Sequence, residues 1–231
     1  MRQGGCTCIV VLLAMGMMGT AHAVSTYSGS LDYSDGGITG IPGNPWMAPG
    51  TTFSWQVDDN GDGTYTYTYR LQVPDGSKAI SHITMEVSPS FLSSNILEVL
   101  QGDIADGQPD AYPNGGADPG MPDSMRGVKF VGGGPDSTDY DWTVSFTTDR
   151  APVWGDFYAK DGTAEGDWVA IWNAGFTDPD TDPTDPAGNA SIANHILVPD
   201  TITDMVPAPG GILLAGFGMG LVGYIRTRRW L

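Results

Sequence analysis

The most regular feature of the chain is an alternation of apolar and polar residues between residues 64 and 73. Every second position is aromatic or aliphatic, and the positions between them are Thr, Arg or Gln. Successive side chains of a β-strand point to opposite faces, so this pattern predicts a strand with one apolar face. The residues of that face are Tyr65, Tyr67, Tyr69, Leu71 and Val73.

A second alternating segment, residues 51–57, precedes the first and carries Phe53, Trp55 and Val57 on one face. Between the two segments, residues 58–63 are Asp, Asn and Gly, which tolerate the positive φ angles of tight turns. The two segments and this turn therefore predict a long antiparallel hairpin.

Further short apolar stretches, separated by turn-like clusters, continue along the chain. They predict strands at residues 80–87, 127–131, 140–147, 153–159 and 168–172. Repeated short strands predict an all-β fold, an antiparallel β-sandwich of the jelly-roll or immunoglobulin-like type.

Other stretches lack this alternation. Residues 91–100, which end before Gly102, predict one short helix. Residues 24–50 suit irregular structure or edge strands, and residues 103–123 and 177–188 predict long loops rich in Asp, Pro and Gly.

The N-terminal segment, residues 1–23, has the three parts of a secretory signal peptide. Arg2 supplies the positive start, residues 9–18 are mostly apolar, and Ala21 and Ala23 are the small residues of a cleavage site. The apolar stretch is too short to span a bilayer comfortably, so we expect cleavage after Ala23 rather than a permanent anchor.

The C-terminal segment, residues 205–231, combines a proline motif, an apolar run from residue 212 to residue 225, and a basic cluster. The motif consists of Val206, Pro207 and Pro209, and the basic cluster consists of Arg226, Arg228 and Arg229. A run of this length crosses most of a bilayer as a transmembrane helix, and the arginines beside it favour the cytoplasmic side. We therefore expect the body of the protein to lie outside.

This tail resembles the PEP-CTERM sorting signal, whose pattern is a Val-Pro-Glu-Pro-like motif, a short Gly-rich and Leu-rich transmembrane stretch, and terminal arginines. The resemblance covers residues 206–231 together with the signal peptide, and Ala208 stands where the family usually has Glu. The pair Gly210-Gly211 leaves open a related tail type that a rhomboid-like protease handles.

Membership of the PEP-CTERM family would imply processing by an exosortase, a membrane-embedded enzyme, in a Gram-negative bacterium that makes extracellular polysaccharide. The protein would lie transiently in the inner membrane, held by its C-terminal helix. It would then reach the cell surface or the extracellular matrix.

Between the two ends, residues 24–204 are expected to form one acidic domain. The formal net charge of the chain is −17, and neither end segment contains Asp or Glu, so the body is more acidic still. Such a surface repels phosphates, which argues against binding to nucleic acid. The cysteines, Cys6 and Cys8, both lie in the signal peptide, which excludes thiol chemistry in the mature protein.

Asp58, Asn60 and Asp62, followed by Gly63, match the opening of a calcium-binding loop, in which alternating oxygen ligands surround the ion. Tyr69, however, stands where such a loop has its bidentate Glu. The pattern favours a plain hairpin turn, with calcium binding as the alternative, and no other cofactor is expected.

The histidines of the body are His82 and His195, and neither has a metal-ligand spacing or lies beside a nucleophile elbow. We therefore expect no enzymatic activity. The leading hypothesis is an exported surface or matrix protein associated with exopolysaccharide. A surface carbohydrate-binding module is the first alternative, and a secreted hydrolase is the second.

Aromatic residues gather in the second half of the body. Core packing explains most of them, but an exposed aromatic strip would stack on sugar rings, as carbohydrate-binding modules do. The residues concerned are Trp142, Trp154, Phe157, Tyr158, Trp168, Trp172 and Phe176.

Overall fold

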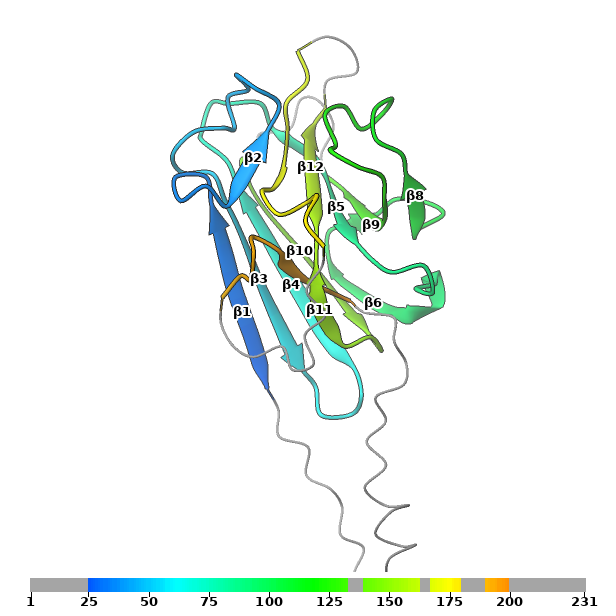
Figure 1. Ribbon diagram of the computed structural model, residues 1–231. Coiled ribbons are helices and arrows are strands. Elements are labelled where there is room, and N and C mark those ends of the chain that lie inside the picture. Colours follow the sequence, from blue (N-terminus) through cyan, green and yellow to red (C-terminus); the bar gives the residue numbers. More distant parts are fainter. Residues whose placement is uncertain (1–24, 133–138, 163–166, 180–189, 200–231) are drawn as a thin grey trace, which may run out of the picture.

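The computed structural model describes residues 25–132, 139–162, 167–179 and 190–199 (Figure 1). The predicted signal peptide (residues 1–23), the predicted sorting tail (residues 205–231) and most of the predicted loop at residues 177–188 lie outside the described residues. The described part is all-β, as predicted, with antiparallel sheets and without an α-helix. Within it, no helix is long and apolar enough to cross a membrane.

One sheet has five strands, and the predicted hairpin forms the second and third of them in spatial order. In spatial order its strands are β1 (Thr26–Asp32), β3 (Thr52–Asp59), β4 (Tyr65–Gln72), β10 (Asp141–Thr148) and β6 (Ile96–Gln101). The register of the hairpin sets Phe53 opposite Leu71 and Trp55 opposite Tyr69. The alternating apolar residues of both strands therefore share one face.

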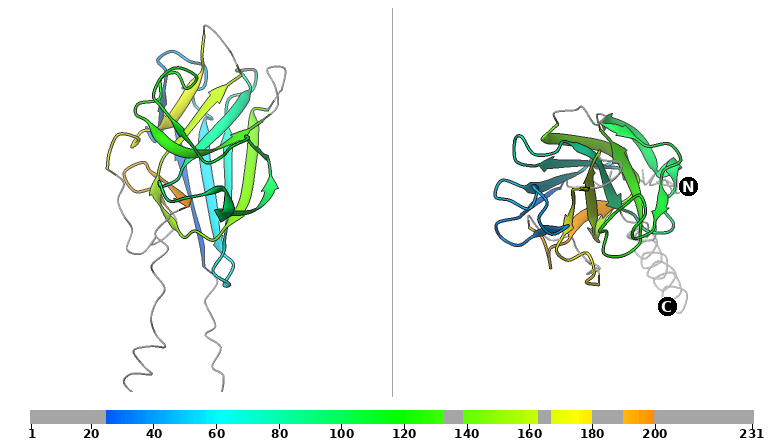
Figure 2. Two further views of the ribbon diagram at one scale, coloured as in Figure 1. Left: turned by 90° about the vertical axis from the view of Figure 1, so that its right-hand side faces the viewer. Right: turned by 90° about the horizontal axis from the view of Figure 1, so that it is seen from above.

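The second large sheet is antiparallel and contains shorter strands. In spatial order these are β2 (Ile38–Gly40), β13 (Ala170–Asn173), β12 (Phe157–Asp161), β5 (Ile80–Glu86), β9 (Met125–Val131) and β7 (Asp103–Ile104), and β8 (Asp110–Tyr112) also pairs with β9. A small sheet joins β11 (Pro152–Gly155) to β14 (Ile196–Pro199). Seen from above, the strands enclose one interior (Figure 2).

The core lies between the two large sheets. Phe53 of β3 and Phe157 of β12 stack on one another, with ring centroids 3.9 Å apart. The predicted apolar faces of the hairpin are confirmed, because Tyr67, Tyr69 and Leu71 are completely buried in this core and Tyr65 is partly buried. Alternation along two strands thus supplies one wall of the interior.

The predicted helix at residues 91–100 is wrong. The chain makes a short 3-10 turn, Ser93–Asn95, and then the strand β6. The amide of Asn95 is buried, accepting a hydrogen bond from the Leu92 N–H at 2.8 Å and donating one to Asp149 at 2.9 Å. These bonds hold the chain beside the end of β10, so pairing between strands outweighs the local preference for helix.

The predicted strand at residues 153–159 is two strands in different sheets. β11 ends at Gly155 and β12 begins at Phe157, with Asp156 between them. The Asp156 N–H donates to a Glu86 carboxylate oxygen at 3.0 Å, and its carbonyl accepts from the Glu86 N–H at 2.9 Å. The chain therefore changes sheets at Asp156.

Candidate functional site

An open cleft of about 520 Å³ lies on the surface between the loop after β2 and the beginning of β13. Its lining residues are Ile41, Pro42, Gly43, Asn44, Pro45, Lys78, Asp167, Trp168 and Val169. Segments far apart in the sequence therefore form one hollow. Aromatic, acidic, basic and apolar side chains all contribute to it.

One wall of the cleft is held rigid by Asn44. The Asn44 amide donates to the carbonyls of Ile41 at 2.7 Å and Ala170 at 3.0 Å. Its oxygen accepts from the backbone N–H groups of Trp46 at 2.9 Å and Met47 at 3.2 Å. The loop is thus tied both to itself and to β13, so the wall exists before any ligand arrives.

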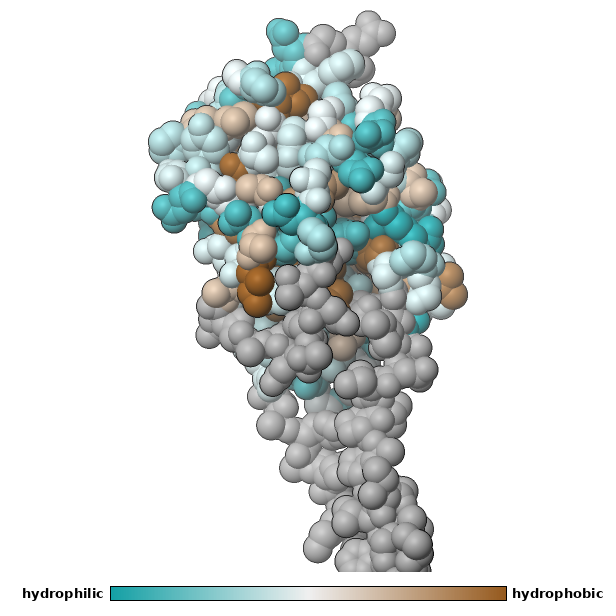
Figure 3. All heavy atoms as spheres, in the orientation of Figure 1, coloured by the Kyte–Doolittle hydropathy of each residue, from teal (hydrophilic) through white to brown (hydrophobic). Residues whose placement is uncertain are grey.

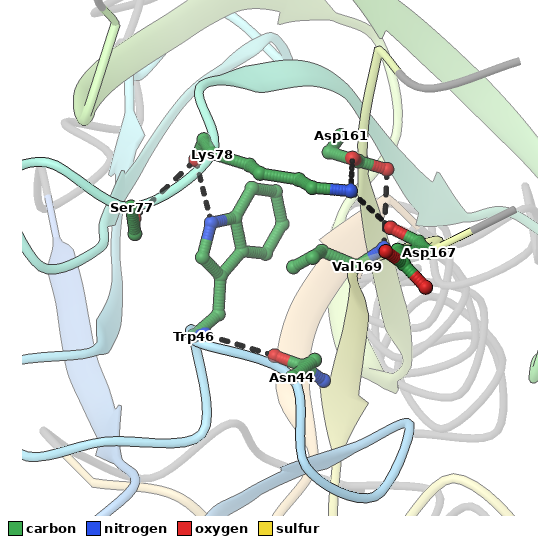
Figure 4. A network of polar contacts seen from close by, with 7 residues as sticks. All are labelled: Asn44, Trp46, Ser77, Lys78, Asp161, Asp167 and Val169. Carbon is green, nitrogen blue, oxygen red and sulfur yellow. Dashed lines mark hydrogen bonds and ion pairs between the residues drawn. The ribbon is translucent and has the colours of Figure 1, made fainter.

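Lys78 lines the cleft, and its ammonium group lies beside Asp161, the last residue of β12, and Asp167 (Figure 4). The ammonium forms an ion pair with the buried carboxylate of Asp161 at 3.2 Å and donates to the carbonyl of Asp167. Behind it, the fully buried Trp46 donates its indole N–H to the Lys78 carbonyl at 2.7 Å. The Asp161 carboxylate also accepts a hydrogen bond from the Val169 N–H at 3.1 Å. Asp161 therefore holds in place both the Lys78 side chain and the segment just before β13.

Trp168 stands at the rim of this cleft with 36% of its surface exposed. Trp154, Phe157, Tyr158 and Phe176 are buried. Trp142 is partly buried against the core between the large sheets, and Trp172 is partly buried against a smaller apolar cluster that contains Tyr158 and Phe176. Core packing therefore accounts for most of the aromatic cluster. The exposed Trp168 lines the same cleft as Lys78 and Asp167, so the cleft combines an aromatic surface with polar groups, as small-molecule sites do.

His195 belongs to a second constellation, which is sealed from solvent. The His195 side chain is completely buried, with Nδ1 3.0 Å from an Asp156 carboxylate oxygen. That oxygen also accepts from the Asn173 amide at 2.6 Å, and Asn173 in turn accepts from the Phe157 N–H at 3.0 Å. The network connects β12, β13 and the segment before β14.

Ser191 lies close to this pair, but its hydroxyl donates to the backbone carbonyl of His195 at 2.7 Å. A nucleophilic serine needs its hydroxyl on the imidazole that accepts the proton. The geometry instead suits a structural network. The sequence did not predict this network, because Asp156 and Asn173 are far from His195 in the chain and follow no recognisable spacing.

His82 is the centre of a third constellation, on the outer face of β5. Its Nε2 lies 3.8 Å from a carboxylate oxygen of Asp118, and both side chains are buried. Burial is the main cause that lowers the pKa of His82; Lys129 and Lys160 lower it further, whereas Asp118 acts in the opposite direction. His82 is therefore held toward its neutral form.

A long loop covers this third constellation. The Tyr158 hydroxyl donates to the carbonyl of Pro119 at 2.9 Å, and the Lys129 ammonium lies 5.7 Å from the centre of the Tyr112 ring. Residues 103–123, predicted as a long loop, thus include the short strands β7 and β8 and close over the face of the second sheet.

The residues of the candidate calcium loop are engaged in hydrogen bonds around the hairpin. Asp58 accepts from the Thr26 hydroxyl at 2.8 Å and the Gln56 amide at 2.8 Å, and Asp62 accepts from the Thr64 hydroxyl at 2.6 Å. Asn60 donates to the Thr64 hydroxyl at 2.9 Å. In the described part of the chain, no three His, Cys, Asp or Glu residues are grouped so as to hold a metal ion.

Comparison with known proteins yields no match: no family model matches the chain, and no curated protein or solved structure is significantly similar to it. The site must therefore be interpreted from its own chemistry.

Proposed function

We propose that this chain is an exported, non-catalytic protein of the cell surface or extracellular matrix, associated with exopolysaccharide. The observation that carries the proposal is the order of its parts. A strongly acidic all-β body stands between a signal-peptide pattern and a tail in which prolines, an apolar run and arginines follow one another. Two facing antiparallel sheets support a β-sandwich of the jelly-roll or immunoglobulin-like type for this body.

The tail supports a transient stay in the inner membrane, followed by processing by an exosortase-type enzyme. Its partner before processing is the bilayer, which accepts the apolar run from residue 212 to residue 225. Afterwards the acidic body stays soluble at the surface, where a large negative charge prevents aggregation.

Immunodetection on intact host cells tests export. We expect antibody against the body to label unpermeabilised cells, and we expect the label to disappear when Ala21→Arg and Ala23→Arg block the cleavage site. A label that appears only after the cells are permeabilised would contradict surface display.

A second function, carbohydrate binding, is favoured by the exposed indole of Trp168 over the cleft. The measurement is glycan-array binding of the exported protein, followed by titration of any polysaccharide that binds. We expect Trp168→Ala to weaken binding by about 0.5–1.5 kcal/mol, the contribution of aromatic stacking beyond buried area, which is up to about a tenfold rise in Kd.

Leu97→Ala is the matched control, because Leu97 is also exposed but lies in β6, on the edge of the other large sheet. This variant should bind as the parent does. Equal losses in both variants, or glycan binding that is indifferent to Trp168, would exclude the cleft as the binding site.

A further inference from the structure

The sequence contains two Asn-Gly pairs, Asn60-Gly61 in the turn of the hairpin and Asn114-Gly115 in the loop after β8. An asparagine before glycine loses its side-chain amide readily, because glycine has no side chain to obstruct attack by its own backbone nitrogen. Both asparagines are exposed. Sequence and exposure alone therefore do not distinguish the two pairs, and their hydrogen bonds must do so.

The first pair is held in place by the hairpin. The Asn60 amide donates to the Thr64 hydroxyl at 2.9 Å and to the Thr66 hydroxyl at 3.2 Å. The Gly61 N–H, whose nitrogen would attack the amide, donates to an Asp59 carboxylate oxygen at 2.8 Å. Ring closure between Asn60 and Gly61 would have to break these bonds, so the fold protects this pair.

The second pair lies in a more open part of the structure. Among the described residues, the Asn114 side chain forms no hydrogen bond. Gly115 and Gly116 have φ angles of +87° and +61°, and a Cβ atom added to either would meet no atom within 4 Å. The segment around β8 lies at the margin of the body in Figure 1, where Figure 3 shows a largely hydrophilic surface. The Asn114 side chain is therefore free to turn toward the Gly115 nitrogen.

We propose that Asn114 is a modification site, at which the folded chain spontaneously converts asparagine into aspartate and isoaspartate. The Gly115 nitrogen loses its proton to hydroxide and attacks Cγ of Asn114. The new N–C bond closes a succinimide ring, and the bond between Cγ and Nδ2 breaks to release ammonia. Water then opens the ring at either carbonyl. One opening gives aspartate, and the other gives isoaspartate, in which the main chain passes through Cγ.

Position 114 immediately precedes the turn that places Asp118 over the second sheet. The Asp118 N–H donates to the Gly115 carbonyl at 3.1 Å, and the Asp118 carboxylate lies 3.8 Å from Nε2 of His82. The reaction adds a negative charge to this loop, and isoaspartate also adds one carbon to its main chain. The modified loop should therefore hold Asp118 less firmly against His82. Water and hydroxide are the only reagents, so the reaction does not depend on the proposed location of the protein.

Peptide mapping by mass spectrometry of the purified full chain tests the proposal, after incubation in the folded state at mildly alkaline pH. Trypsin cleaves after Arg70, Lys78 and Arg126, so Asn60 and Asn114 fall in different peptides. Samples digested without incubation give the baseline. We expect deamidation at Asn114 to be at least several-fold faster than at Asn60. Asn114→Gln should abolish the change in its own peptide and leave the rate at Asn60 unaltered.

The same incubation in urea separates the effect of the fold from that of the local sequence. Unfolding removes the hydrogen bonds of Asn60 and Gly61, so the two rates should approach one another. Equal rates in the folded protein, or an Asn114 that reacts in urea but is stable in the folded protein, would overturn the proposal. A ratio of rates that is the same with and without urea would also overturn it, because the preference would then belong to the neighbouring residues alone.

Discussion

Phe53 and Phe157 stack across the interior with only 11° between their ring planes, although they belong to different sheets. Both side chains are completely buried, so removing one ring leaves a cavity that the two sheets cannot fill. We expect Phe157→Ala to lower the free energy of unfolding by about 3–5 kcal/mol, measured by urea titration. Ile192→Ala, at an exposed position, should change it by less than about 0.5 kcal/mol. Similar values for the two variants would contradict a shared core between the sheets.

The buried contact between Asp156 and His195 should contribute to stability in the same way. Asp156→Ala removes the acceptor of both His195 and Asn173 and leaves their polar groups in the interior. The expected loss of free energy of unfolding is about 1–3 kcal/mol for each of these groups, measured by urea titration. Asp141→Ala is the control, because Asp141 forms an exposed ion pair with Arg70, and removing such a pair should leave the free energy of unfolding nearly unchanged.

The buried imidazole of His82 predicts a pH dependence of stability. Because burial lowers the pKa of His82 below its ordinary value of 6.5, the unfolded chain binds a proton that the folded chain does not bind between those two pKa values. Stability should therefore fall as the pH is lowered through about 6.5. His82→Gln should reduce the loss of free energy of unfolding between about pH 7.5 and about pH 5.5. Parallel pH profiles for the two proteins would exclude a contribution from His82.

Calcium should add little to stability. Thr64 hydrogen-bonds to Asp62 and lowers the pKa of that carboxyl group. The residue at the twelfth position, Tyr69, points into the core, where its hydroxyl donates to the Leu197 carbonyl at 2.9 Å. We expect no change in Tm on adding millimolar calcium. A rise in Tm that Asp58→Ala or Asp62→Ala abolishes would instead establish a calcium site, since a ligand stabilises the state that it binds.

The strands were predictable where the information is local. Alternation between residues 64 and 73 identified a strand and its buried face, because a period of two is a property of the strand itself. The helix prediction at residues 91–100 failed because the buried amide of Asn95 bonds to Asp149, 54 residues away. Helix propensity depends on neighbouring residues alone, so a prediction based on it does not include a contact between residues so far apart.

The candidate site was only partly predictable. The sequence analysis gave an exposed aromatic strip as the alternative to core packing, but the selection of Trp168 depends on which side chains the sheets bury. Lys78 and Asp161, which shape the cleft, carry no sequence signal, because they lie 83 residues apart and belong to no motif. Their proximity follows from the pairing of β5 with β12.

The most direct test of the proposed function is intact-mass analysis of the protein released from the surface of its native host. The proline motif is expected at the outer boundary of the membrane, and the terminal arginines resist translocation at about 2.5–3.5 kcal/mol each at a helix centre. We therefore predict a chain that begins at Val24 and ends near Pro207, and replacement of Arg226, Arg228 and Arg229 by neutral residues should reduce its yield. Recovery of chains that still end at Leu231 would contradict processing of the tail and indicate a permanent anchor.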